Sequence, residues 1–234
     1  MMSKNDIKQQ IGNYAAKLVQ NHTTVGLGTG TTVSYFLVAL AQRIKKEHLD
    51  IVGVTTSEKT TLSAKELGIR IVDIDDTDGI DLTIDGADEV DTYLNGIKGG
   101  GAALLMEKIV AKNSKENVWI VDESKVHNIL GSFPLPVEVV PFGSGRLYRE
   151  FALKGLNPRY RVDNLGRRIV TDAQHYIIDL VLDVINNPYE LAQYLESRVG
   201  VVEHGLFLGI ANRVIVGNDD GIEVLERRTA NQKL

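Results

Sequence analysis

Charged side chains of both signs gather around a run of glycines in residues 81–108. Two carboxylates, Asp85 and Asp88, are followed by Lys98, by three consecutive glycines and by Glu107. A carboxylate held against carbon can move a proton, and a neighbouring lysine can stabilise the oxyanion that forms. Each charged residue alone would be typical of a solvated turn or helix surface. Their density within one segment favours a single site for proton transfer on an anionic ligand.

The flanking sequence predicts the elements that position these groups. The run DLTID alternates apolar and polar residues and predicts a strand that ends at Asp85. In an open α/β sheet, ligands bind beyond the carboxyl ends of the strands, so Asp85 and Asp88 would border a crevice. Residues 102–112 contain good helix formers without a breaker, and helical spacing directs Glu107 toward the same crevice. The first amides of that helix would point at an anion.

A second glycine-rich turn, GLGTGTT at residues 26–32, predicts a phosphate site. Its threonines would bring hydroxyl donors to a helix N-terminus. The turn is not the dinucleotide fingerprint, because Thr31 or Val33 stands where the last glycine is required, and no Gly-Lys-Ser/Thr follows as in a P-loop. Taken alone, the turn is equally typical of a tight β-to-α connection. Lys125, after a later predicted strand, would lie at the same sheet edge, whereas we expect Lys8 to be solvated.

Short apolar runs alternate with helical patterns over the first half of the chain. After a helix at residues 5–20 and the strand, turn and helix around the GLGTGTT block, strands are predicted at residues 51–54, 69–74, 81–85 and 118–122. This alternation predicts a parallel, Rossmann-like sheet. The run VIVG near the C-terminus predicts a strand that returns to this sheet.

The alternation stops at FPLPVEVVPFG, which holds three of the five prolines. The segment beyond it indicates the order β-α-β-β-α-β, which matches the ferredoxin-like motif, and none of its residues suggests catalysis. We therefore predict an α/β protein with a Rossmann-like catalytic domain formed by residues 1–131 and 207–234. A smaller α+β domain, residues 132–206, would be inserted into it.

Composition restricts the classes of partner and cofactor. The chain has 234 residues, a net charge of −5 and no cysteine, which disfavours a nucleic-acid partner and excludes disulfides and thiol catalysis. The N-terminus is polar and amphipathic, so we expect no signal peptide, no membrane span and a cytoplasmic location. The five histidines lack ligand spacing, and the acidic run at residues 73–78 lacks the correctly placed glycine of a calcium loop. No metal site is predicted.

Several sequence blocks together resemble a known family. The blocks GLGTGTT, TIDGADEVD, IKGGGAALLMEKIVA, VDESK and FPLPVEV occur in the order and spacing of the type A ribose-5-phosphate isomerases, over nearly the whole chain. The DGADE and KGGGAALLMEK blocks are the specific ones. The resemblance implies interconversion of D-ribose 5-phosphate and D-ribulose 5-phosphate in the non-oxidative branch of the pentose phosphate pathway. It also implies no cofactor and a homodimer or homotetramer in which the smaller domain makes oligomer contacts.

The resemblance also implies roles for individual residues. Glu107 looks like the general base between C1 and C2, Asp85 like the carboxylate that assists ring opening, and Asp88 and Lys98 like groups at the reacting end. The substrate-binding set that it implies is Thr29, Gly30, Thr31, Thr32, Asp85, Gly86, Ala87, Asp88, Lys98, Gly99, Gly100, Gly101 and Lys125. One departure is Thr31, where serine is usual in the family, although its hydroxyl and amide are retained.

Other functions remain open on the residues alone. A sugar-phosphate deaminase-isomerase would share the phosphate turn, and a coenzyme A transferase would use its glutamate as a nucleophile. A lysine and two aspartates around Glu107 favour proton transfer through an enediolate, with a base near carbon and donors near the developing oxyanion. A sugar-phosphate sensor that binds without turnover would need a DNA-binding module, for which the sequence before the first strand leaves no room.

Overall fold

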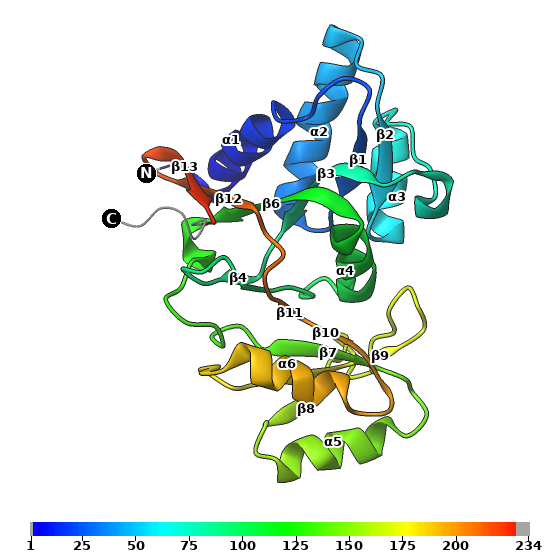
Figure 1. Cartoon of the computed structure of the whole chain (residues 1–234), viewed down its shortest axis with the longest axis vertical. Coiled ribbons are helices and arrows are strands. Elements are labelled where there is room, and N and C mark those ends of the chain that lie inside the picture. Colours follow the sequence, from blue (N-terminus) through cyan, green and yellow to red (C-terminus); the bar gives the residue numbers. More distant parts are fainter. Residues whose placement is uncertain (1, 228–234) are drawn as a thin grey trace.

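The computed structural model describes residues 2–227, which form two sheets with their helices, one above the other in Figure 1. The upper sheet has six strands in the order β13-β12-β6-β3-β1-β2. Its strands are β1 (Thr24–Leu27), β2 (Val52–Thr55), β3 (Ile80–Gly86), β6 (Ser114–Asp122), β12 (Arg213–Asn218) and β13 (Gly221–Glu226). All neighbouring pairs are parallel except β12 with β13. The predicted Rossmann-like sheet and its returning VIVG strand are therefore confirmed, with an unpredicted antiparallel strand at one edge.

Strand order places a ligand crevice at the carboxyl end of β1. The chain passes from β1 to β2 on one side, and β3 lies on the other side of β1. Ligands in open α/β sheets bind where the strand order reverses in this way, because the two following connections leave to opposite faces. The GLGTGTT turn follows β1, and Asp85 and Asp88 lie at and just beyond the carboxyl end of the neighbouring strand β3.

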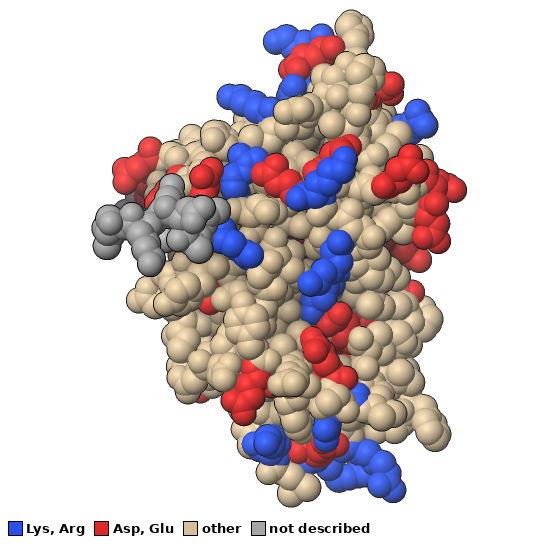
Figure 2. All heavy atoms as spheres, viewed as in Figure 1, with Lys and Arg blue, Asp and Glu red and all other residues tan. Residues whose placement is uncertain are grey.

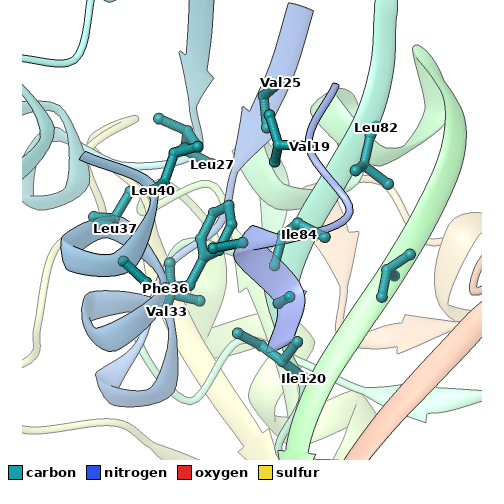
Figure 3. Packing of buried hydrophobic residues seen from close by; sticks show 14 of the residues in the cluster. Val19, Val25, Leu27, Val33, Phe36, Leu37, Leu40, Leu82, Ile84 and Ile120 are labelled. Atoms are coloured by element: carbon teal, nitrogen blue, oxygen red, sulfur yellow. The ribbon is translucent and has the colours of Figure 1, made fainter. Parts of the chain in front are cut away.

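Helices cover both faces of the six-stranded sheet. The helices are α1 (Lys4–Ala16), α2 (Thr31–Glu47), α3 (Glu58–Glu66) and α4 (Leu104–Lys112). Figure 3 shows the core beneath α2, where Phe36 and Leu40 point toward the strand residues Leu27 and Ile84. All four side chains are fully buried, and burial of one such side chain stabilises the fold by about 1.5–3 kcal/mol. This packing fixes the N-terminus of α2 over the carboxyl end of β1.

The lower sheet confirms the ferredoxin-like order. Its elements are β7 (Leu135–Val139), α5 (Ser144–Leu153), β8 (Pro158–Tyr160), β9 (Tyr176–Leu180), α6 (Pro188–Glu196) and β10 (Val201–His204). The four strands are antiparallel in the order β10-β7-β9-β8. A small third sheet joins β11 (Leu206–Phe207), β5 (Gly96–Ile97) and β4 (Glu89–Val90) between the two. The division into domains of residues 1–131 plus 207–234 and 132–206 stays a prediction.

One predicted strand is wrong. Residues 69–74 form only a single bridge, between Gly53 and Ile71. The Gly53 amide donates to Arg70, and Val72 donates back to Gly53, after which pairing stops. The side chain of Asp73 then accepts a hydrogen bond from Asp75 and starts the 3-10 turn η1 (Ile74–Asp76). The apolar alternation was present, but a capping aspartate turned the chain away from the sheet edge.

The surface carries mixed charge. On the face in Figure 2, lysine and arginine side chains are interspersed with acidic side chains and separated by uncharged areas. No helix within residues 2–227 combines the length and the apolar character that crossing a membrane requires.

Candidate active site

A cavity of about 220 Å³ lies at the carboxyl ends of β1, β3 and β6. Most of the predicted site residues line it, from the GLGTGTT turn, the DGADE block, the KGGG turn and α4. These are Thr29, Gly30, Thr31, Thr32, Gly86, Ala87, Asp88, Lys98, Gly99, Gly101, Glu107 and Lys125. Asp85 and Gly100 are absent from this lining, and Asp85 lies just behind it, against Lys98.

Asp85 joins the two glycine-rich segments from inside strand β3. Its Oδ1 accepts hydrogen bonds from the amides of Thr29 at 3.0 Å and Gly86 at 2.7 Å. Its Oδ2 lies 2.9 Å from the Lys98 ammonium. A Cβ atom at Gly28 would lie 2.0 Å from Asp85 Oδ1 and 2.6 Å from its Cα, so only glycine permits this approach. The glycine-rich turn at residues 26–32 and the Asp85 carboxylate are therefore packed directly against each other.

Lys98 is the buried cation at the centre of the site. Its side chain is 2% exposed, and its Nζ lies 3.1 Å from Glu107 Oε1 and donates to the carbonyl of Gly86 at 2.6 Å. Burial alone would lower the pKa of Lys98, but the negative charges of Asp85 and Glu107 outweigh burial. The net effect is a raised pKa, so the ammonium stays protonated beside the cavity.

Glu107 occupies the first turn of α4 and has one unpaired oxygen. Its Oε2 is buried and has no hydrogen-bond partner among residues 2–227. Burial raises the pKa of Glu107 to about 8; the charge of Lys98 opposes this rise, and the carboxylates of Asp85 and Asp88 add to it. A carboxyl group that exchanges its proton near neutral pH suits general acid–base chemistry.

The turn before α4 is held in a conformation that places its amides near these groups. The Gly100 amide donates to Asp88 Oδ2 at 2.7 Å, and a Cβ atom at Gly100 would lie 2.5 Å from Asp88 Oδ1. Ala102 has a φ of 60°, so the helix begins only at Leu104 and not at the predicted residue 102. Asp88 itself lines the cavity and is therefore placed to contact a ligand.

The other end of the cavity has the features of an anion site. Helix α2 begins at Thr31, directly after Gly30 with a φ of 136°, so its first amides and its positive dipole end border the cavity. Lys125, at the end of the 3-10 turn η2 (Glu123–Lys125), also lines it. Lys8, which we expected to be solvated, is only partly buried but also contributes to the site. Lys8 lines the cavity, and its Nζ donates to Thr31 Oγ1 at 2.9 Å.

Thr29 differs from its two neighbours in the turn. Its hydroxyl contacts Thr56 Oγ1 and Ser57 Oγ, each at 2.8 Å, at the start of α3. Its amide is bound to Asp85. Both polar groups of Thr29 therefore hold the turn in place, while Thr31 and Thr32 carry the free helix N-terminus.

Comparison with known protein sequences identifies the family of this chain. A sequence model of the family described as ribose 5-phosphate isomerase A (phosphoriboisomerase A) matches residues 52–221. The chain belongs to the ribose 5-phosphate isomerase A family. A protein named ribose-5-phosphate isomerase A from Lactococcus lactis subsp. cremoris is 52% identical over 222 residues, covering 95% of this chain and 99% of the relative. One from Streptococcus thermophilus is 54% identical over 221 residues, covering 94% and 98%.

Solved structures of ribose 5-phosphate isomerases share the fold. The enzyme from Methanocaldococcus jannaschii has a TM-score of 0.91 and 36% identity, covering 96% of this chain and all of that chain. A D-ribose-5-phosphate isomerase in complex with phospho-erythronic acid has a TM-score of 0.93 and 37% identity, covering 97% and 100%. The predicted fold class and the resemblance are thereby confirmed. The roles of the individual site residues in this ribose 5-phosphate isomerase A family member stay predictions.

Proposed function

We propose that this chain interconverts D-ribose 5-phosphate and D-ribulose 5-phosphate through an enediolate, as an enzyme of the non-oxidative pentose phosphate pathway. The observation that carries the proposal is the buried Glu107 carboxyl, which has an unpaired oxygen and lies beside Lys98, in the same cavity as the α2 N-terminus. Membership of the ribose 5-phosphate isomerase A family supports it. The phospho-erythronic acid complex of a related structure supports a sugar phosphate as the ligand class.

The phosphate is assigned to the α2 end of the cavity. Thr31 and Thr32 supply amides and hydroxyls, and Lys8 and Lys125 supply positive charge. Binding energy from this remote group orients the open-chain sugar toward Glu107, so it lowers the barrier without taking part in bond changes. In this arrangement Asp88, which lines the cavity, lies near the sugar hydroxyls, and Asp85 lies just behind the cavity against Lys98. We assign ring opening and hydroxyl proton transfer to them.

Glu107 then moves one proton between two carbons. In the aldose-to-ketose direction its carboxylate removes the proton from C2, and the electron pair forms the C1–C2 double bond while charge shifts to O1. Lys98 and the turn amides stabilise that oxyanion. The enediolate takes a proton on O1 and loses one from the hydroxyl on C2, and Glu107 returns its proton to C1. The net change is one isomerisation, with every proton retained or exchanged with water.

We also propose a homodimer or homotetramer in the cytoplasm, with no nucleic-acid or membrane partner. We further propose that residues 1–131 with 207–234 act as the catalytic domain and residues 132–206 as an inserted α+β domain. The antiparallel ferredoxin-like order of β7 to β10 supports that division. Light scattering of the purified protein tests the oligomeric state, and a monomeric mass would refute it.

The deciding experiment measures conversion of ribose 5-phosphate in the presence of a chelator for wild type, Glu107→Gln and Glu116→Gln. Glu116 lies on β6 and pairs with Arg213, so its variant controls for loss of a glutamate elsewhere. We expect chelator-resistant turnover in wild type and Glu116→Gln, and a kcat about 10²- to 10⁴-fold lower in Glu107→Gln with binding retained. Lack of turnover in wild type would favour the deaminase or sensor functions. Full activity of Glu107→Gln would refute the role of Glu107 alone.

A further inference from the structure

The glycine turn at residues 99–101 borders the reacting end of the cavity and presents unpaired amides. Within residues 2–227, the amides of Gly99 and Gly101 form no hydrogen bond, whereas the Gly100 amide is bound to Asp88. Gly99 and Gly101 both line the cavity. Three consecutive glycines have more backbone freedom than any other sequence, and Gly99 has a φ of 104°. Within the turn the Ala102 amide donates to the Gly99 carbonyl at 3.0 Å, whereas no backbone amide of residues 2–227 donates to the Gly100 carbonyl, which is left for an external contact.

That contact comes from Arg161, 62 residues away in the sequence and just beyond β8. Its Nη1 donates to the carbonyl of Gly99 at 2.6 Å and to the carbonyl of Gly100 at 3.1 Å. The other side of the guanidinium is fixed by Asp179 of β9, because Nε donates to Oδ2 at 2.9 Å and Nη2 pairs with Oδ1. The two side chains are 15% and 17% exposed, so solvent screens this pair weakly.

Because the peptide unit is planar, the direction of each carbonyl also fixes the direction of the N–H group that follows it. In a trans peptide the carbonyl of one residue and the N–H of the next point in opposite directions. Arg161 holds the Gly99 carbonyl, which directs the Gly100 N–H toward Asp88. It also holds the Gly100 carbonyl, which directs the Gly101 N–H away from the guanidinium, and Gly101 lines the cavity.

We propose that Arg161 is a positioning residue for the isomerase reaction, which clamps the glycine turn from behind so that the free Gly101 amide meets the oxyanion of the enediolate. This role rests on the proposed function. Arg161 acts through the turn and does not itself reach the substrate. A lysine cannot replace it fully, because only the planar guanidinium can bind a carboxylate with two nitrogens and also donate to two carbonyls.

The test compares Arg161→Met and Arg161→Lys with Arg198→Met. Arg198 pairs with Glu150 in the same four-stranded unit and touches neither the turn nor the cavity, so it is the matched control. The measurements are kcat and KM for ribose 5-phosphate, inhibition constants of phospho-erythronate and of inorganic phosphate, and the melting temperature. The carboxylate of phospho-erythronate stands in for the enediolate oxygens, and inorganic phosphate reports the remote anion site alone.

For Arg161→Met we expect kcat to fall about 10- to 100-fold with KM changed less, since misplaced donors act on the transition state. The inhibition constant of phospho-erythronate should rise by a similar factor and that of inorganic phosphate should not change. Arg161→Lys should lie between wild type and Arg161→Met. Arg198→Met should match wild type in all five quantities.

A kcat of Arg161→Met equal to that of Arg198→Met would overturn the proposal, as would an equal loss of affinity for phospho-erythronate and inorganic phosphate. If Arg161→Met does not fold, Arg161→Lys decides the question, and wild-type kcat and inhibition constants in it would refute the clamp. A wild-type protein that binds phospho-erythronate without turning over ribose 5-phosphate would refute the proposed function instead. The inhibition constants would still decide whether Arg161 directs the Gly101 amide.

Discussion

Two buried lysines, Lys98 and Lys108, lie near the ring of Phe207 but are neutralised in different ways. Their Nζ atoms are 5.3 Å and 4.8 Å from the ring centroid. Lys98 faces two carboxylates and has a raised pKa, whereas Lys108 faces mainly Glu203, and burial lowers its pKa against that opposing charge. The same residue type, packed near the same ring, therefore serves two different purposes.

The difference lies in which polar atoms remain unpaired. Lys108 donates to Glu203 Oε1 and to the carbonyl of His204, both at 2.6 Å, and so ties α4 to β10. Around Lys98, by contrast, the partner Glu107 retains an unpaired oxygen, Oε2. A buried charge that serves structure is bound by several groups, because an unpaired one is costly. A buried charge that serves chemistry leaves a neighbouring atom free for the substrate.

The largest expected effect within this comparison is on Lys98. Lys98→Met should lower kcat by about 10²- to 10³-fold, since it removes the positive charge beside the developing oxyanion. Because the charge of Lys98 opposes the raised pKa of Glu107, the pKa of Glu107 should rise further in this variant. Steady-state kinetics across pH would show both effects. An unchanged kcat would mean that Lys98 resembles Lys108 in serving structure alone.

Lys108→Met should affect stability more than rate. Removing one partner of a largely buried pair should lower the free energy of unfolding by roughly 3 kcal/mol, as Glu203 and the His204 carbonyl lose their donor. Chemical denaturation measures this loss, and kcat measured well below the melting temperature should stay near that of wild type. A large loss of kcat at unchanged stability would place Lys108 among the catalytic groups.

The pH dependence of the rate should report Glu107. Since the carboxylate form accepts the carbon-bound proton, kcat/KM should rise with pH around an inflection near the pKa of about 8. Asp85→Asn should move that inflection to lower pH, because the charge of Asp85 raises the pKa of Glu107. An inflection in the usual range of a glutamate in both proteins would contradict the assignment.

The same pKa shift predicts a stability effect of definite sign. The folded pKa of Glu107 lies above its usual value of 4.5, so its contribution to stability is fully present below pH 4.5 and is lost as the pH rises through about 8. Glu107→Gln should lose less stability than wild type over this interval. Thermal melts at a series of pH values would show the difference, and parallel curves would argue against a raised pKa.

The smallest effect is expected at Lys8, which is only partly buried and contacts Thr31. Lys8→Met should raise KM about three- to tenfold and leave kcat nearly unchanged, because it weakens a remote phosphate contact that solvent already screens. The loss should shrink at higher salt. A lower kcat with an unchanged KM would show that Lys8 acts on the reaction and not on phosphate binding.

The sequence predicted the groups that lie close together in the chain or follow strand ends. Asp85, Lys98 and Glu107 could be assigned to one site because residue type and glycine spacing are local signals, and strand ends meet at one sheet edge. Residues 69–74 were mispredicted because an alternating pattern shows only that the segment could form a strand. It does not show that a neighbouring strand pairs with the segment over its whole length. The capping side chain of Asp73 was the available contrary signal.

Other parts of the site depend on distant contacts and leave no local pattern. Lys8 reaches Thr31 across 23 residues, and Arg161 reaches Gly99 across 62. The sequence around Lys8 and around Arg161 does not distinguish either residue from an ordinary exposed lysine or arginine. The hydroxyl of Thr29 looked available for a ligand, and only the packing of α3 against the turn shows that it is already bound.

The contact between Arg161 and the glycine turn also sets a minimum size for this protein. Every carboxylate and lysine of the site comes before β7 in the chain, so a shortened chain lacking the lower sheet would keep the full set of reactive groups. It would lack the guanidinium that faces the Gly99 and Gly100 carbonyls, as well as the β11 partner of β5 if the cut reached it. A miniaturised version would therefore have to supply a substitute brace for the turn before removing the lower sheet.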